Sequence, residues 1–480
     1  MLFNSYEFIL LFLPVTWIGF FCIARLSHQL AAFWLAVASV LFYGWWNPNF
    51  VLLLLLSIVF NYAMGFVIGK AKNASNSRSL LIIAIAINLG LLGYFKYVNF
   101  FISTLNEISG QRLVLVDVVL PLGISFFTFT QIAFIVDVYR GIAKEYRFVH
   151  YLLFVTYFPH LIAGPVLHHK QMMPQFGTAK TYRPNPGLAA IGTVVFTTGL
   201  AKKVLLADNF AEYSMLVFDM ATNGVAPDFI AAWIGALSYT LQLYFDFSGY
   251  TDMAIGLSLL FGITLPQNFN SPYKAQNIIE FWRRWHMTLS RFLKDYLYIP
   301  LGGNRHSPFR THINILLTML LGGLWHGANW TFVVWGGVHG CYLIVNHAWN
   351  AAMNLYEFGN KGILGSRIIG TALTFLAVVV AWVIFRSDSI ASAQIMLEAM
   401  SSPSGIWPYF FGKKAGLLFA IGIIIVFLLP NSQSIGIWFR DSALAKQAPV
   451  GILSGVVCGL GFAVAFMALQ KKSEFLYFQF

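Results

Sequence analysis

The segment that decides the fold of this protein runs from Phe281 to Trp330. It opens with FWRRWHMTLSRFLKDYLYIPLGGNR (Phe281–Arg305) and closes with GGLWHGANW (Gly322–Trp330). In the first stretch, apolar side chains recur every three or four positions and basic side chains fall on another face, which predicts an amphipathic helix at a membrane surface. The residues Ile313–Trp325 are nearly all apolar and lead directly into His326. An ionisable side chain at membrane depth usually faces the protein interior or a hydrated cavity.

On this pattern alone, His326 is either a functional imidazole or a buried histidine that caps a neighbouring carbonyl. Polar residues elsewhere favour the functional interpretation. The run LYFDFSGYTDMA (Leu243–Ala254) sets Asp246 and Asp252 beside a spanning segment, where a carboxylate must be paired or hydrated. Asp246 has the alternative of pairing with an arginine, and Asp252 that of starting the next helix as a first-turn acid.

The composition predicts an all-α polytopic membrane protein. Of the 480 residues, 58% are hydrophobic and 10% are charged, and the mean hydropathy is +0.70. Soluble globular chains are about half apolar and a quarter charged. We therefore expect a single membrane-embedded domain over residues 1–480, organised around residues 281–340, the stretch to which the resemblance described below assigns the catalytic core. The three cysteines show neither metal-ligand spacing nor a disulfide pattern.

Apolar runs of helical length predict 11 to 13 transmembrane and re-entrant helices. Two of the runs, Phe229–Phe245 and Met253–Leu265, are expected to be separate helices. A third, Tyr151–Val166, contains two prolines, a glycine and a histidine, and broken backbone of this kind survives at membrane depth only when it is buried in protein or lines a cavity.

The net charge of +12 lies in the short segments between apolar runs, which indicates membrane orientation and not nucleic-acid binding. We place these segments on the cytoplasmic side and the N-terminus outside, in a multi-pass protein; the resemblance described below implies a bacterial inner membrane. The basic residues that define the cytoplasmic side include Lys70, Lys72, Arg78, Arg140, Lys144, Arg147, Lys170, Lys180, Arg183, the run Arg283–Arg310, Lys471 and Lys472.

Other motifs argue against several classes of enzyme. The sequence has no phosphate-binding Walker loop and no GxSxG nucleophile elbow. His168 and His169 have no partner at zinc-protease spacing, so we assign no metal site.

Taken together, eight segments resemble the membrane-bound O-acyltransferase family, in the bacterial branch typified by the alginate O-acetyltransferase membrane subunit. They cover nearly the whole chain: LFLP (Leu11–Pro14), FYGWW (Phe42–Trp46), FPHLIAGPV (Phe158–Val166), YFDFSGYTDMAIG (Tyr244–Gly256), FWRRWHMTLS (Phe281–Ser290), YIPLGGNR (Tyr298–Arg305), GLWHGANW (Gly323–Trp330) and YFQF (Tyr477–Phe480).

The resemblance implies a catalytic role for His326, the match to the family's histidine deep in the membrane core. A second polar residue of the family matches His286, 40 positions earlier. The implied fold is a ring of tilted helices around a thinned centre and a catalytic channel, with a cytoplasmic opening for the acyl donor and an outer funnel for the acceptor. The resemblance also implies transfer to an exported or envelope polysaccharide, with a periplasmic or membrane-anchored acetyltransferase as partner, in contact with membrane lipids and without nucleic acid.

The chemistry of acyl transfer from a thioester needs a base for the attacking hydroxyl and a donor for the developing oxyanion. A buried histidine is neutral near pH 7 and can serve as the base, a role we assign to His326. We assign His286 to orientation or oxyanion support, and Asn329, Asp246 and His339 to supporting positions. The expected donor is acetyl-CoA or another acyl thioester, with no bound cofactor. Its phosphates are expected to meet Arg284, Arg291, Lys294 and Arg305.

Two alternatives stay open at this point. A proton-coupled transporter also has broken helices and intramembrane Asp and His residues, although its two related halves are not apparent in the sequence. A structural subunit of an export complex would tolerate substitution of the histidines. The acceptor is not specified by the sequence.

Overall fold

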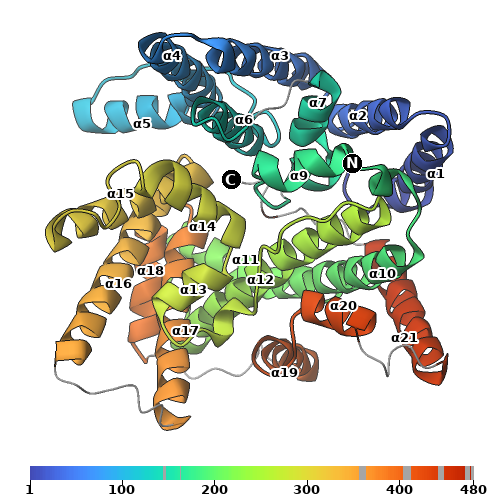
Figure 1. Ribbon diagram of the computed structural model, residues 1–480. Coiled ribbons are helices and arrows are strands. Elements are labelled where there is room, and N and C mark those ends of the chain that lie inside the picture. The colour runs from blue at the N-terminus through green and yellow to red at the C-terminus, as the bar shows by residue number, and fades with distance from the viewer. Residues whose placement is uncertain are drawn as a thin grey trace. The chain divides into compact units, whose positions relative to one another are not determined.

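The structure is a computed structural model of the chain that describes residues 1–143, 147–162, 164–355, 364–403, 412–441, 448–470 and 476. Throughout these residues the regular secondary structure is helical and no strand occurs (Figure 1). This confirms the all-α fold predicted from the composition. Lys144, Lys471, Lys472 and the terminal YFQF motif lie outside the described residues.

The contacts divide the chain into two compact units whose segments alternate along the sequence. The first unit comprises Met1–Leu200, Tyr250–Pro266 and Ile435–Lys472, and the second comprises Ala201–Gly249, Gln267–Ser434 and Ser473–Phe480. The single domain over residues 1–480 stays a prediction.

The first unit contains a succession of helices joined by short turns. In order they are η1 (Phe8–Phe12), α1 (Leu13–Ala24), α2 (His28–Gly44), α3 (Asn49–Lys70), α4 (Ala74–Leu92), η2 (Gly93–Tyr97), α5 (Val98–Ser109), α6 (Ile124–Tyr139), α7 (Phe148–Thr156), α8 (Phe158–Leu161), α9 (His169–Phe176), η3 (Ala179–Tyr182), α10 (Pro186–Ala201), α21 (Ala448–Met467) and η7 (Ala468–Gln470).

The second unit holds the Phe281–Trp330 segment and begins in the middle of a long helical stretch. Its elements are η4 (Lys202–Ala207), α11 (Asp208–Thr222), η5 (Pro272–Lys274), α13 (Ile278–Arg284), α14 (Met287–Leu293), η6 (Lys294–Tyr298), α15 (Pro308–His326), α16 (Trp330–Leu355), α17 (Leu364–Arg386), α18 (Ile390–Ser401) and α19 (Lys413–Phe427). Three of the described helices contribute residues to both units: α12 (Phe229–Leu260), α20 (Ser432–Asp441) and α10, whose last residue, Ala201, belongs to the second.

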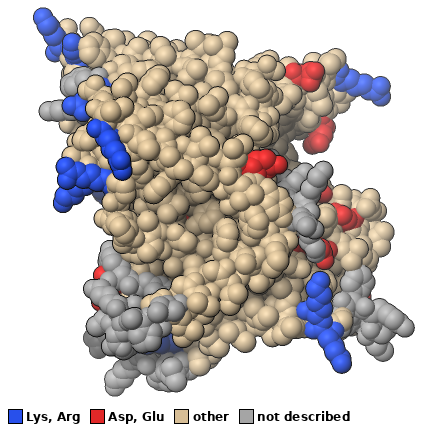
Figure 2. Space-filling view, turned by 90° about the vertical axis from the view of Figure 1, so that its right-hand side faces the viewer, with Lys and Arg blue, Asp and Glu red and all other residues tan. Residues whose placement is uncertain are grey.

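Several helices have the length and apolarity of a membrane span. Among the described residues, four segments pass this test, namely Asn49–Lys70, Ala74–Ser109, Pro186–Thr222 and Arg367–Arg386. A fifth is possible if Lys413–Phe427 and Ser432–Trp438, which meet at a 60° bend, form one broken span. Uncharged residues also cover most of the surface that faces the viewer in Figure 2. The structure thus agrees with a polytopic membrane protein, while the ring and the count of 11 to 13 helices stay predictions.

Two local expectations were wrong. The runs Phe229–Phe245 and Met253–Leu265 are not separate, because α12 continues through both as one 32-residue helix. Asp252 therefore lies inside a helix and does not start one. The amphipathic stretch after Phe281 is not one helix either, because the chain breaks at Trp285 and His286 between α13 and α14. The break expected within Tyr151–Val166 is confirmed, since α7 ends at Thr156 and Tyr157 has a non-helical backbone.

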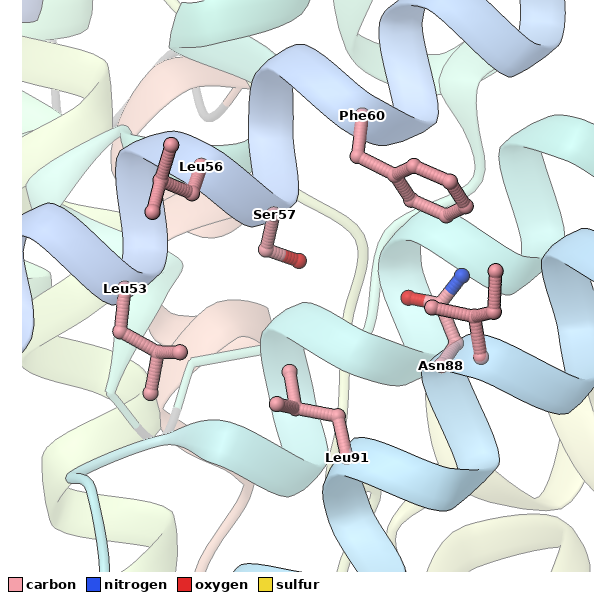
Figure 3. A pocket seen from close by; sticks show the side chains of 7 residues that line it. Leu53, Leu56, Ser57, Phe60, Asn88 and Leu91 are labelled. Carbon is pink, nitrogen blue, oxygen red and sulfur yellow. The ribbon is translucent and has the colours of Figure 1, made fainter.

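Polar side chains inside the first unit pair with one another. Asn61 on α3 and Asn88 on α4 are buried and exchange two amide hydrogen bonds of 3.0 and 2.7 Å. Beside this pair lies a cavity of about 250 Å³, lined by Leu53, Leu56, Ser57, Phe60, Ile87, Asn88 and Leu91 (Figure 3). The lining is mostly aliphatic and aromatic, and the cavity contains no acid–base group.

A close helical hairpin of α15 and α16 supports the centre of the second unit (Figure 1). Glycines at the contact allow the two backbones to approach. A β-carbon at Gly323 would lie 2.2 Å from the carbonyl oxygen of Phe332, and one at Gly336 would lie 2.2 Å from that of Met319. Small residues at such positions are typical of helices that pack closely in membranes. The hairpin places His326, at the end of α15, beside the first turns of α16.

Candidate active site

The backbone around His286 has an uncommon conformation. His286 precedes α14 with φ 41° and ψ 53°, in the left-handed region that non-glycine residues rarely occupy. The flanking backbone pairs with an earlier segment, because the N–H of Asn270 donates to Arg284 O at 2.9 Å and the N–H of Met287 donates to Asn268 O at 2.9 Å. Conformations of this kind persist when the surroundings determine them, and they are concentrated at functional sites.

Asn268 connects this backbone to the imidazole. Its side-chain oxygen Oδ1 accepts hydrogen bonds from the backbone N–H of Thr288 at 3.2 Å and from the Thr288 hydroxyl at 2.8 Å. The same oxygen lies 3.1 Å from Nδ1 of His286. Asn268, His286 and Thr288 are all buried. The ring of His286 therefore has a fixed orientation at the centre of a packed polar cluster.

His326 lies close to His286, as the sequence predicts for two residues of one site. The two imidazole centres are 6.5 Å apart, and His326 is 6% exposed and His286 1% exposed. At this separation a single reacting group between the rings can contact both. Aromatic rings enclose His326, with Trp325 at 5.0 Å, Trp335 at 5.2 Å and Phe385 at 5.3 Å between ring centres. This apolar enclosure strengthens electrostatic interactions inside the site because it reduces screening by water.

His339 lies behind His326, consistent with the supporting position expected for it. Trp335 separates the two histidines, with ring centres 5.2 Å from His326 and 4.9 Å from His339. The indole N–H of Trp282 donates to Nδ1 of His339 at 3.3 Å, and Phe281 stacks on its ring. His339 therefore holds the aromatic wall of the site.

Asp246 forms a buried ion cluster. Lys203 lies 2.5 Å from a carboxylate oxygen of Asp246 and 2.8 Å from one of Asp208, and all three side chains are less than 8% exposed. The backbone N–H of Leu476 also donates to Asp246. The partner of Asp246 is thus a lysine, where the alternative considered from the sequence was an arginine. Its neighbour Phe247 packs against His286, with ring centres 4.8 Å apart, so α12 connects the ion cluster to the site.

The side chain of Asn329 forms hydrogen bonds with Asp388 and Thr331. Its side-chain amide donates to the carbonyl of Asp388 at 2.8 Å and its oxygen accepts from the N–H of Thr331 at 3.0 Å. These bonds hold the start of α16 and use one of the two N–H groups of the Asn329 amide.

The basic residues predicted to bind the donor differ in their surroundings. Arg284 is half-buried and donates through Nε and Nη2 to Glu280, at 3.0 and 2.7 Å, and through Nη1 to the carbonyl of Asn270. Arg291, Lys294 and Arg305 are exposed on and after α14. Arg284 therefore stabilises the loop before His286, whereas the other three are available to a ligand.

The chemistry available at this site is proton transfer and hydrogen bonding by the two imidazoles. Burial lowers the pKa of His286, which lies outside the candidate spans, to about 3, so its ring is uncharged at neutral pH. Among the described residues, no group of three or more His, Cys, Asp or Glu side chains has the arrangement of a metal site. Sequence reasoning missed Asn268, Lys203 and Trp335, which become recognisable only from their contacts in the fold.

The fold and site together define a helical membrane protein with a buried pair of histidines. The family model described as "MBOAT, membrane-bound O-acyltransferase family" matches residues 40–393, most of the chain. The chain belongs to the membrane-bound O-acyltransferase family and is an acyltransferase. The family resemblance predicted from the motifs is thereby confirmed, and the enzyme class is favoured over the transporter.

Relatives with descriptive names support the same class. The chain is 38% identical to the peptidoglycan O-acetyltransferase of Helicobacter pylori over 100% of its own length and 98% of the relative. It is 45% identical to a probable alginate O-acetylase of Pseudomonas aeruginosa, over 85% of this chain and 76% of the relative. A more distant match is the teichoic acid D-alanyltransferase of Streptococcus thermophilus, at 28% identity over 48% of this chain and 57% of the relative.

Proposed function

We propose that this enzyme takes an acetyl group from a cytoplasmic thioester, acetyl-CoA, and moves it across the bacterial inner membrane for O-acetylation of an envelope polysaccharide. The observation that carries the proposal is the pair of buried imidazoles, His286 and His326, 6.5 Å apart within an aromatic enclosure. The names of two relatives, a peptidoglycan O-acetyltransferase and a probable alginate O-acetylase, support a polysaccharide as the final acceptor.

In the proposed reaction, His326 removes the proton from the attacking hydroxyl. The hydroxyl oxygen forms a bond to the thioester carbonyl carbon, and the carbon–sulfur bond breaks as the CoA thiolate leaves. The proton held by His326 then returns to the sulfur, so that the products are the acetyl ester and free CoA thiol. His286 orients the reacting groups. A positioned acid–base group of this kind contributes about 10²–10⁴ in rate.

The donor is proposed to approach from the side that carries the exposed basic residues Arg291, Lys294 and Arg305. The positive-inside rule supports a cytoplasmic location for Lys72 and Arg305 and an external one for Asn47 in a multi-pass arrangement. Transfer onward through a periplasmic or membrane-anchored acetyltransferase is part of the proposal and rests on the family resemblance alone.

The test is acetyl transfer by the purified protein in lipid nanodiscs, followed as CoA thiol release and as label on a glycan acceptor. His326→Ala should lower the rate by about 10²–10⁴ while the protein stays monodisperse. His326→Gln preserves size and hydrogen bonding but cannot take the proton, so it should be equally inactive. A folded His326→Gln protein with near-normal transfer would refute the assignment of the base.

The matched control is a buried histidine of the first unit. His169 is buried and lies 3.3 Å from Asp137 in the first unit. His169→Gln should retain transfer at the parental rate per folded protein. If both glutamine variants lost activity to the same extent, the loss would report on general disturbance of buried histidines and would contradict a specific role for His326.

A further inference from the structure

We propose that Asn268 is a positioning residue that holds His286 in one tautomer, with the proton on Nδ1 and the lone pair on Nε2. The inference deepens the proposed function, on which it rests for its kinetic consequences. It begins from the orientation of the Asn268 amide, which the neighbouring groups determine.

The amide of Asn268 has only one orientation that satisfies Thr288. The backbone N–H of Thr288 is a donor with no acceptor capacity, so the atom 3.2 Å from it must be the amide oxygen and not the amide nitrogen. The Thr288 hydroxyl donates to the same oxygen at 2.8 Å. In this orientation the amide nitrogen Nδ2 is buried and has no hydrogen-bond partner among the described residues. The two hydrogen bonds from Thr288 therefore hold the amide oxygen on the Thr288 side, although the amide nitrogen donates to no group there.

The orientation of the amide decides the tautomer of the imidazole. Nδ1 of His286 lies 3.1 Å from Asn268 Oδ1, and an amide oxygen can only accept. A favourable contact therefore requires a proton on Nδ1. Because burial keeps the ring neutral, it has a single proton, and Nε2 must carry the lone pair. Nε2 lies across the ring from Nδ1 and so points away from Asn268.

The consequence is a specific function for His286 within the pair. A neutral imidazole with its lone pair on Nε2 accepts a hydrogen bond there and has no proton to give to an oxyanion. His286 therefore orients the acceptor hydroxyl or the ring of His326 by accepting from it. The oxyanion support considered from the sequence is excluded for this tautomer.

The left-handed backbone at His286 fits this interpretation. Ser271 and His286 are the two non-glycine residues with positive φ in the described part of the chain. Ser271 follows the backbone segment that pairs with Arg284 and Met287, and His286 lies between those two paired residues. Strain of this kind is maintained by the surrounding structure. Here the pairing holds the imidazole against Asn268.

The kinetic test compares three substitutions. Asn268→Leu removes the acceptor and should lower kcat by about 10²-fold, as for a misoriented reacting group, at unchanged KM for acetyl-CoA. Asn268→Asp keeps an acceptor for Nδ1–H and should recover most of kcat at high pH. Its carboxylate favours the imidazolium, so the acid limb of its pH profile should shift to higher pH. His326 is a titratable side chain near His286, with ring centres 6.5 Å apart, and the parent, Asp and Leu proteins share it.

Gln267→Leu is the matched control for a purely structural role. It removes the hydrogen bond from the Gln267 amide to the carbonyl of Phe269 in the same loop but leaves the bonds of Asn268, so it should retain the parental kcat even if it destabilises the loop. Equal loss of kcat in Gln267→Leu and Asn268→Leu would show that Asn268 only packs the loop. An Asn268→Asp protein as inactive as Asn268→Leu at every pH would overturn the acceptor role.

A spectroscopic measurement is independent of activity. Nitrogen-15 shifts of histidine-labelled protein distinguish a protonated from an unprotonated ring nitrogen, and the signal of His286 is assigned by its loss in His286→Asn. The expected result is a protonated Nδ1 and an unprotonated Nε2 at pH 7, and the reverse pattern refutes the proposal. If the parent protein shows no acetyl transfer, the proposed function fails, while this measurement still decides the tautomer.

Discussion

The contact between α15 and α16 leads to a sharp prediction at two adjacent glycines, Gly336 and Gly337. A β-carbon at Gly336 would lie 2.2 Å from the carbonyl oxygen of Met319, whereas one at Gly337 would lie 3.4 Å from the end of the Leu320 side chain. The first distance is far inside van der Waals contact with rigid backbone, and the second is ordinary contact. Gly336→Ala should therefore push the two helices apart by about 1 Å, and Gly337→Ala should be accommodated.

The energies follow from two opposing effects. Replacing glycine by alanine inside a helix stabilises it by up to about 1 kcal/mol, which applies to both variants. Overpacking costs about 1–3 kcal/mol and applies only to Gly336→Ala. Gly337→Ala should thus unfold at or above the parental temperature, and Gly336→Ala should be about 1–3 kcal/mol less stable than Gly337→Ala.

Catalysis should respond more strongly than stability, because α15 ends at His326 and a misplacement of about 1 Å can cost about 10²-fold in rate. The assays are thermal unfolding in detergent and acetyl transfer per folded protein at a temperature where both variants are folded. A Gly336→Ala protein that matches Gly337→Ala in both would refute the reasoning, since it would mean that the helices accommodate a β-carbon at no cost.

Three further predictions concern other parts of the molecule. Lys203→Met leaves two buried carboxylates without their cation and should lower the free energy of unfolding by about 3–5 kcal/mol. The control, Lys414→Met at an exposed position, should leave the unfolding midpoint unchanged, and similar midpoints for the two variants would contradict a buried ion cluster. The pKa of His286 is about 3 in the folded protein and 6.5 when exposed, so between these pH values the unfolded chain binds one more proton and stability should fall as the pH drops from 6.5 towards 3. In His286→Asn the unfolding midpoint should depend less on pH, and an unchanged pH dependence would contradict the lowered pKa of His286. Asn88→Leu leaves the amide oxygen of Asn61 without its donor and should cost about 1–3 kcal/mol, which Asn61→Leu in the same protein should partly restore; strictly additive losses would argue against the pair.

The helical membrane fold was accessible from the sequence because it depends on composition and on the lengths of apolar runs. These are local properties, and the structure confirms the all-helical fold they predict. Where a prediction from the sequence was wrong at His286, the cause was an interaction between residues that are distant in the chain. Apolar spacing runs without interruption from Trp282 through Leu289, so nothing local marks the break at His286. The break depends on pairing with Asn268, 18 positions earlier in the chain.

The residues of the site were predictable to different degrees for the same reason. His286 and His326 carry a recognisable chemical type in a motif, and the fold brings them together as expected. Asn268 lies in the unremarkable segment Gln267–Asn270, and its importance rests on contacts with residues that follow it by 18 and 20 positions. Lys203 lies at the end of an apolar run, where its basic side chain gives no indication that it is buried between two carboxylates.

The two histidines reach the site by opposite structural means, and this difference bears on their roles. His326 ends a long regular helix, positioned by the packing of α15 on α16 and enclosed by Trp325, Trp335 and Phe385. These aromatic rings limit the access of water to His326, which suits a base that takes and returns a proton within the site. His286 sits in a strained turn with its Nδ1 against Asn268. A ring held on one side in this way keeps its orientation throughout a reaction cycle, so the geometry favours His326 as the group that changes protonation and His286 as the fixed reference against which the substrate is aligned.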